Sequence, residues 1–187
     1  MPKKNNIINN LIPESIHTIE ELINALFTVS KDNYGQVFRK IDLQAEDFKV
    51  YSSWSKESYT RNYIVENEAF ELILICWEED QVTAIHDHGG EECWVYSIEG
   101  EFKEAIYTES DGGELLEFSN KTIGTGSITY MIDFMGFHSI KNCSKQRGMT
   151  LHLYAKPIKT CQVFDPTTFS LVQKDLKYDT SQGVSLN

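Results

Sequence analysis

The chain has 187 residues, a formal net charge of −11 at pH 7 and 41% hydrophobic residues. This length fits a single domain with a substantial core. The acidic balance argues against a nucleic-acid partner, because phosphate binding requires a basic surface. No apolar run approaches the length of a membrane span, and Lys3-Lys4 lead into Asn-rich sequence rather than an apolar signal segment.

Four cysteines lack the CxxC spacing that is typical of zinc sites. Without a sign of export, we expect free thiols in a reducing compartment and therefore a cytoplasmic protein. No extended apolar patch is visible in the sequence, so we also expect a monomer. The four residues are Cys76, Cys93, Cys143 and Cys161.

Residues 15–58 follow a mainly helical pattern. Apolar residues recur at helical spacing, and Thr18 ahead of two glutamates is a typical helix N-cap. We expect two further short helices, over residues 37–41 and 45–51. Residues 1–14 are largely polar and are expected to be flexible.

After Tyr59 the pattern changes to short apolar segments separated by clusters of Gly, Asp and Asn. Many short strands after a helical start predict a mainly β chain with a helical N-terminal part, whose core at residues 59–165 is an antiparallel β-barrel or jelly roll. We expect the chain, residues 1–187, to be one domain and its polar end, residues 178–187, to be flexible. The predicted strands cover residues 70–77, 82–88, 93–98, 102–107, 127–131 and 149–154.

His86-Asp87-His88 is the most informative motif of the chain. Side chains two residues apart on a strand point to the same face, so both imidazoles can reach one metal ion. His138 can arrive from a neighbouring strand and complete one face of a coordination sphere. Three neutral ligands with open positions suit Fe(II) better than a closed structural zinc site. A bare HxH is a weak signal, and His17 is expected to be an ordinary surface or core histidine.

The surroundings of the histidines strengthen this interpretation. Gly100 lies twelve residues after the HxH motif, and Asn142 lies four residues after the third histidine. This arrangement resembles the two motifs of the cupin superfamily. Cys93 occupies the place where many cupins have a glutamate ligand. Two positions of the second motif depart from the usual proline and glycine: Asp133 and Met135.

Residues 149–154 alternate between polar and apolar side chains. Thr150, His152 and Tyr154 share one face, which in a barrel would face the cavity. The histidine and tyrosine tips are close enough in sequence to share a hydrogen bond. The alternative is a buried polar pair that only satisfies itself.

Arg61, within Tyr59-Thr60-Arg61-Asn62, is the candidate anion-binding residue. A cavity-facing arginine binds a carboxylate through two parallel hydrogen bonds, which lysine cannot reproduce. The alternative is an ordinary surface arginine.

Together these motifs resemble the cysteine dioxygenase family, whose members are non-haem iron enzymes of the cupin fold. The resemblance runs from about residue 59 to residue 165, with a weaker match in the helical start. It rests, in chain order, on Tyr59-Thr60-Arg61-Asn62, Cys76-Trp77, Ile85-His86-Asp87-His88, Cys93, Gly100, His138, Leu151-His152-Leu153-Tyr154 and Cys161.

The resemblance implies that His86, His88 and His138 hold Fe(II). It also implies that Arg61 and Tyr59 hold the carboxylate of L-cysteine. The activity that it implies is the oxidation of the cysteine thiol to a sulfinic acid, with both atoms of O2 incorporated.

The resemblance further implies that His152 orients Tyr154, whose hydroxyl lies near the substrate. In part of the family, a cysteine at the position of Cys93 is joined to this tyrosine by a thioether, whereas many bacterial members have glycine there. Gly89-Gly90 looks like the bacterial pattern, so the sequence leaves the crosslink open. Trp77 is expected to pack behind the tyrosine.

Three other positions bear on the resemblance. Cys161 matches a family cysteine near the pocket entrance. Thr150 stands where serine is common, and we expect little change because the hydroxyl remains. At Ala155-Lys156-Pro157, where some relatives have a cis peptide, we expect a trans bond before Lys156, since a cis bond there is costly.

Other functions stay open at this point. Relatives that act on 3-mercaptopropionate tend to carry glutamine where Arg61 stands, so this arginine favours cysteine. A non-catalytic cupin that binds a metal or small ligand would not need the tyrosines, Arg61 and His152. A cupin isomerase or decarboxylase that uses zinc or nickel is disfavoured by Cys93 in the place of the fourth carboxylate ligand.

Overall fold

The computed structural model describes residues 12–186, so the flexibility predicted for residues 1–11 lies outside the described part. No helix in this range is long and apolar enough to cross a membrane. The helices are α2 (Ile19–Thr28), α3 (Tyr34–Phe38) and the 3-10 helices η1 (Lys31–Asn33), η2 (Ala45–Phe48) and η3 (Asp133–Met135). The strands are β1 (Thr60–Glu66), β2 (Glu71–Trp77), β3 (Cys93–Glu99), β4 (Phe102–Glu109), β5 (Leu115–Ile123), β6 (Ile128–Met131), β7 (Phe137–Asn142), β8 (Gly148–Tyr154), β9 (Thr160–Asp165), β10 (Ser170–Asp175), β11 (Thr180–Ser181) and β12 (Val184–Ser185).

The helical start is confirmed, with shorter helices than expected. α2 begins where Thr18 Oγ1 accepts a hydrogen bond from the backbone N–H of Glu21 at 3.1 Å, as the N-cap prediction requires. The predicted helix over residues 37–41 is instead α3, which ends earlier. Ile41 is extended because it forms a parallel bridge with Ile16.

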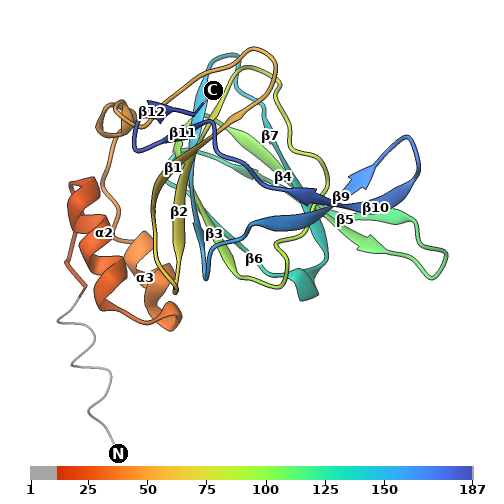
Figure 1. Cartoon of the computed structure of the whole chain (residues 1–187), viewed down its shortest axis with the longest axis horizontal. Coiled ribbons are helices and arrows are strands. Elements are labelled where there is room, and N and C mark those ends of the chain that lie inside the picture. The colour runs from red at the N-terminus through yellow and green to blue at the C-terminus, as the bar shows by residue number, and fades with distance from the viewer. Residues whose placement is uncertain (1–11, 187) are drawn as a thin grey trace, which may run out of the picture.

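The main sheet, within residues 12–186, has seven strands in the order β12-β11-β1-β2-β8-β3-β6. Its inner strand β8 is buried along its whole length, and antiparallel pairing with β2 and β3 fixes its register. Apolar side chains on one face of the sheet pack against the helices. In Figure 1, α2 and α3 lie on one side of the sheet, away from β4 and β7.

The opposite face of the main sheet packs against a second layer of strands. In the described chain this layer consists of the three-stranded sheet β5-β4-β7 and the hairpin β10-β9. Residues of both layers form one buried cluster, including Ile75 of β2, Phe102 of β4 and Ile140 of β7. Two packed antiparallel layers with helices outside form the jelly roll of the cupin fold, so the predicted fold class is confirmed.

One expectation about the strands was wrong at the HxH segment. Residues 82–88 do not form a regular strand; they make isolated bridges, with Val82 and His86 pairing to β7 and His86 also pairing to β9. The segment therefore connects two sheets instead of belonging to one.

The end of the chain, expected to be flexible over residues 178–187, contains β11 and β12 in the described part. β11 pairs with β1 in parallel. Thr180 is buried, and its hydroxyl donates to Asn62 Oδ1 at 2.9 Å. The buried amide of Asn62 thus gives this polar segment a specific partner, which its own sequence did not reveal.

Candidate active site

The HxH segment is fixed between β7 and β9. The backbones of His86 and His138 exchange two hydrogen bonds, each 2.9 Å long. Asp87 pairs with Gln162 of β9, whose backbone N–H donates to the Asp87 carboxylate at 2.8 Å. These contacts bring the third histidine, far away in sequence, beside the first.

The three imidazoles converge on one point. One ring nitrogen from each of His86, His88 and His138 lies within 4.8 Å of the others. The Nε2 atoms of His88 and His138 are 3.0 Å apart. Two nitrogens bound at right angles to one metal ion at about 2.1 Å are also about 3 Å apart, so the donor set fits a facial metal site.

The environment of the histidines favours their neutral form. Burial and then the neighbouring His138 lower the pKa of His86 to about 3. The same two causes lower the pKa of His88 well below its usual range. A metal ligand must be deprotonated, so these imidazoles are in the state that binding requires.

Asp133 holds the loop that carries His88. Its carboxylate accepts hydrogen bonds from the backbone N–H groups of His88, at 2.9 Å, and Gly90. Gly89 and Gly90 have φ values of 62° and 92°, which side chains rarely tolerate, so two glycines allow the chain to turn tightly after His88. Asp133, a departure from the usual cupin motif, thus supports the histidine loop.

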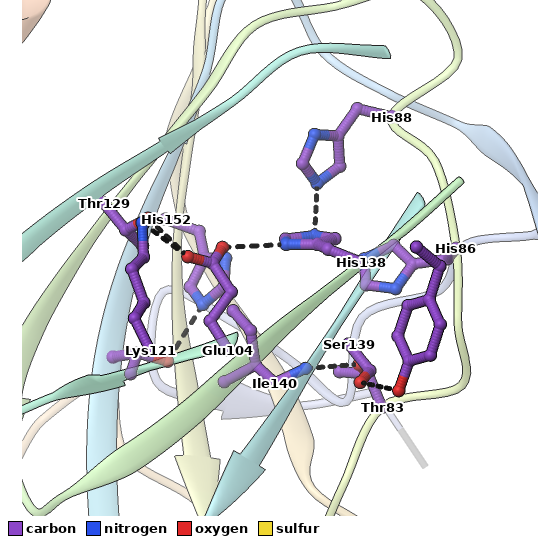
Figure 2. Close-up of polar contacts among 12 residues, drawn as sticks. Thr83, His86, His88, Glu104, Lys121, Thr129, His138, Ser139, Ile140 and His152 are labelled. Carbon is purple, nitrogen blue, oxygen red and sulfur yellow. Dashed lines mark hydrogen bonds and ion pairs between the residues drawn. The ribbon is translucent and has the colours of Figure 1, made fainter. Parts of the chain in front are cut away.

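Glu104 of β4 is a buried carboxylate behind His138 that the sequence analysis did not single out (Figure 2). Its Oε1 pairs with His138 Nδ1 at 2.9 Å. Its Oε2 accepts from Thr129 Oγ1 at 2.5 Å and from Lys121 Nζ at 2.9 Å. Burial alone would raise the pKa of Glu104, but the hydrogen bond and charge of His138, with help from Thr129 and Lys121, lower it to about 2.

Arg61 and Tyr59 lie on β1 and its preceding residue and line a small cavity of about 40 Å³ beside His86. Arg61 Nε and Nη2 are buried and have no hydrogen-bond partner within the described chain. Buried donors of a guanidinium without a partner are costly, so these two are prepared for an anionic ligand. Besides these residues, the cavity is lined by side chains that include His152, Tyr154, Cys161, Lys174 and Leu176.

Thr150 and His152 form a polar chain with Trp77. The indole N–H of Trp77 donates to Thr150 Oγ1 at 2.9 Å, and the same hydroxyl shares a second hydrogen bond with His152 Nε2, also at 2.9 Å. His152 Nε2 therefore pairs with Thr150 and not with Tyr154, contrary to our expectation. Trp77 packs against Tyr59, with ring centroids 4.9 Å apart, instead of backing Tyr154.

Cys93 and Tyr154 lie directly opposite each other on the paired strands β3 and β8. Such cross-strand neighbours have Cβ atoms about 5 Å apart, so their side chains can touch. Burial is the main cause that raises the pKa of both groups well above the usual values. The thiol and the phenol are therefore both neutral at pH 7.

The structure brings all eight predicted site residues to the inner side of the jelly roll. His86, His88 and His138 share one centre, and Tyr59, Arg61, His152 and Tyr154 line the adjoining cavity. Cys93 lies beside the last of these. Sequence reasoning missed Glu104; an acidic residue at the same strand face as buried Phe102 was the available signal.

A jelly roll with three converging histidines on its inner face defines a cupin with a candidate metal centre. A family model described as cysteine dioxygenase type I matches residues 9–167. The chain therefore belongs to the cysteine dioxygenase type I family, a family of dioxygenase enzymes.

Individual cysteine dioxygenases match a similar length of the chain. The chain is 27% identical over 165 residues to cysteine dioxygenase type 1 of Rattus norvegicus and to that of Homo sapiens, covering 84% of this chain and 82% of each relative. Among solved structures, it is similar to an RmlC-like cupin protein of Desulfovibrio desulfuricans, at 17% identity and a TM-score of 0.45, over 57% of this chain and 91% of that one.

Proposed function

We propose that the chain converts L-cysteine and O2 to cysteine sulfinic acid, with Fe(II) held by His86, His88 and His138. The observation that carries this proposal is the buried Arg61, whose two unpartnered donors face the cavity next to the three histidines. When bound, Fe(II) would supply the redox chemistry that joins both oxygen atoms to the substrate sulfur. The protein residues would bind and orient the substrate and hold protons near it.

Arg61 and Tyr59 are proposed to hold the substrate carboxylate. The guanidinium Nε and Nη2 form a planar pair that matches two carboxylate oxygens. Burial raises the pKa of the Tyr59 phenol, which therefore stays protonated and can donate a third hydrogen bond. Thiols without a carboxylate would leave Arg61 unpaired and are expected to be poor substrates.

His152 and Tyr154 are proposed to form the proton-holding side of the site. Burial, reinforced by Cys93, raises the pKa of Tyr154 well above its usual value, so its hydroxyl is a donor at neutral pH. The Trp77–Thr150–His152 chain of hydrogen bonds holds the ring of His152 through its Nε2 atom. This chain keeps the polar wall of the cavity in one arrangement.

A thioether between Cys93 Sγ and a ring carbon of Tyr154 is proposed as a further feature of the active protein. Forming it removes one S–H and one ring C–H hydrogen, with O2 as the acceptor of the two electrons and two protons. The opposite placement of the two residues on β3 and β8 supports it. Intact mass after aerobic turnover should fall by about two hydrogens, and a single unmodified mass would refute the crosslink.

Two alternatives are tested together with the main proposal. The metal-free protein is loaded with Fe(II) under anaerobic conditions, and O2 uptake and products are then measured with L-cysteine and with 3-mercaptopropionate. Coupled uptake that yields cysteine sulfinate, with little use of 3-mercaptopropionate, is the expected result. Preference for 3-mercaptopropionate would identify the rival dioxygenase, and no uptake by iron-loaded protein would favour a non-catalytic metal-binding cupin.

The same proposal includes a cytoplasmic, monomeric protein. All four cysteines are free, and Cys76, Cys93 and Cys161 are buried, which suits a reducing compartment. Light scattering at several protein concentrations would decide the oligomeric state.

A further inference from the structure

Glu104 is the one carboxylate among the described residues that pairs with an imidazole of the candidate metal centre. Its side chain is 1% exposed, as is that of His138. A buried carboxylate is stable only when charged or polar groups compensate it. Here three side chains do so, and all three come from strands packed around β4: His138, Thr129 and Lys121 (Figure 2).

The contact fixes the orientation and tautomer of His138. A carboxylate only accepts hydrogen bonds, so His138 Nδ1 must carry the proton that Glu104 Oε1 accepts at 2.9 Å. The lone pair of Nε2 is then directed away from Glu104, toward His88 Nε2 at 3.0 Å. A metal ligand must present such a free nitrogen lone pair.

The other two histidines lack such a partner. His86 Nδ1 lies 2.9 Å from a neutral acceptor, the backbone carbonyl of Ala84. His88 Nδ1 is buried and has no hydrogen-bond partner in the part of the chain that the structure describes. An anionic partner makes an imidazole a stronger ligand than a neutral one does, so the three ligands are unequal.

We propose that Glu104 is a positioning residue that makes His138 the strongest ligand of the metal centre, and that Thr129 and Lys121 hold its carboxylate for this task. The inference rests on the proposed metal binding, but not on the identity of the substrate. Lys121 is about half-exposed and reaches the buried carboxylate from the surface. A chain of contacts thus runs from His138 through Glu104 of β4 to Lys121 at the protein surface.

The test compares metal affinity in Glu104→Gln and unaltered full-length protein. The substituted side chain keeps a carbonyl acceptor of the same length but loses the charge. Each protein is freed of metal and titrated with Co(II) in air and Fe(II) under anaerobic conditions, against a competing chelator. We expect the dissociation constants to rise roughly 10- to 100-fold in the variant, the range typical of lost partners of metal ligands.

Glu117→Gln provides the matched control. Glu117 lies on β5 of the same sheet and pairs with Lys103 at 3.8 Å, with both side chains 40% or more exposed. Its loss should leave metal affinity unchanged. Equal affinities in Glu104→Gln, Glu117→Gln and unaltered protein would overturn the proposal.

A second readout needs no metal. Long-range 1H–15N spectra of the metal-free protein should show His138 protonated at Nδ1, and the Nδ1–H resonance should shift upfield in Glu104→Gln as its acceptor loses charge. A merely structural role of Glu104 would not move this resonance. His138 protonated at Nε2 in unaltered protein would contradict the inference.

Two milder variants decide the matter should Glu104→Gln fail to fold. Lys121→Met and Thr129→Val each remove one contact to the carboxylate and are expected to weaken Co(II) binding several-fold in the same direction. Unchanged binding in both would overturn the supporting role of these residues and with it the proposal. Unaltered protein that binds neither metal would refute the proposed function itself, whereas failure of this inference alone leaves metal binding intact.

Discussion

The two faces of β8 differ in what their burial requires. Met149, Leu151 and Leu153 point to the helical side and join an apolar cluster. Thr150 and His152, between them, point to the cavity and are equally buried, but each needs a polar partner. Apolar packing tolerates many arrangements of similar volume, whereas a buried polar group requires one. Residues that stabilise the fold and residues proposed to act on the substrate therefore lie on opposite faces of β8. Substitutions should affect stability on one face and activity on the other.

His138→Ala tests the cavity side most severely. Loss of one of three ligands should weaken Fe(II) binding by more than the roughly 100-fold expected for an outer partner, and cysteine-dependent O2 uptake should disappear. The metal-free variant should keep the fold but lose stability, because buried Glu104 loses one of its three partners. Metal analysis and thermal unfolding check both points, and retained iron would refute the ligand assignment.

Leu151→Ala probes the opposite face. The side chain is fully buried among the helices, so truncation should lower the free energy of unfolding by about 2–5 kcal/mol. KM and metal affinity of the folded fraction should be normal, because the cavity face keeps all its groups. Urea unfolding and kinetics at a low temperature measure the two effects, and a large rise in KM would show that the faces are coupled.

Arg61→Ala separates substrate binding from metal binding. Loss of two hydrogen bonds to a charged group should raise KM for cysteine on the order of 100-fold. Iron content should change little, since Arg61 is not among the converging ligand atoms. Arg61→Lys should recover only a small part of the loss, because lysine lacks the planar pair of donors. Unchanged kinetics would remove Arg61 from the site.

Acid should destabilise the protein first through the buried polar groups that face the cavity. Burial, and then Arg61, lowers the pKa of His152 well below its usual value, so the unfolded chain gains a proton first as the pH falls. Stability is therefore complete above about pH 6.5 and is lost below it, by roughly 1 kcal/mol per pH unit for one histidine. Glu104, whose pKa is lowered to about 2, adds to the acid destabilisation only below about pH 4.5.

Urea unfolding of metal-free protein at pH 7, 6 and 5 checks this order. The slope between pH 6 and 5 should decrease in His152→Gln, where that proton is absent. The same slope in the variant and the unaltered protein would assign the acid sensitivity to other groups.

Strands, and the side chains that share one face of a strand, could be predicted from local patterns in the sequence. Alternation placed Thr150, His152 and Tyr154 on one face of β8, and the inner strands β2, β3 and β4 were located within a few residues. The fold class followed from this pattern of short strands and from the family resemblance. These predictions succeeded because strand periodicity acts over a few residues.

The predictions failed where partners lie far apart in sequence. β1 was missed because its buried positions include the polar residues Thr60 and Asn62, which a hydrophobic pattern does not reveal. Asn62 is satisfied by contacts with Ser53 and Thr180. Glu104 escaped notice for the same reason, since its histidine partner is 34 residues away.

The smallest expected effect concerns the mouth of the cavity. Lys174 and Leu176 line both the inner cavity and an outer groove, as do Tyr59 and Arg61, so these four residues mark where the two spaces meet. Lys174 makes no ion pair with the other residues that the structure describes, and the chain as a whole carries a charge of −11. An unpaired cation at this point would attract the carboxylate of the substrate, which acidic groups elsewhere on the surface repel.

Lys174→Gln should therefore raise KM for cysteine by roughly twofold to fivefold, as expected for a solvated charge worth under about 1 kcal/mol. The difference from unaltered protein should vanish at high salt, because exposed charges are screened. Lys177→Gln is the matched control, since Lys177 lines only the outer groove and should have a smaller effect. Equal effects of the two substitutions would mean that the mouth attracts substrate by its general charge, whereas a salt-independent loss at Lys174 would indicate direct contact with the bound substrate.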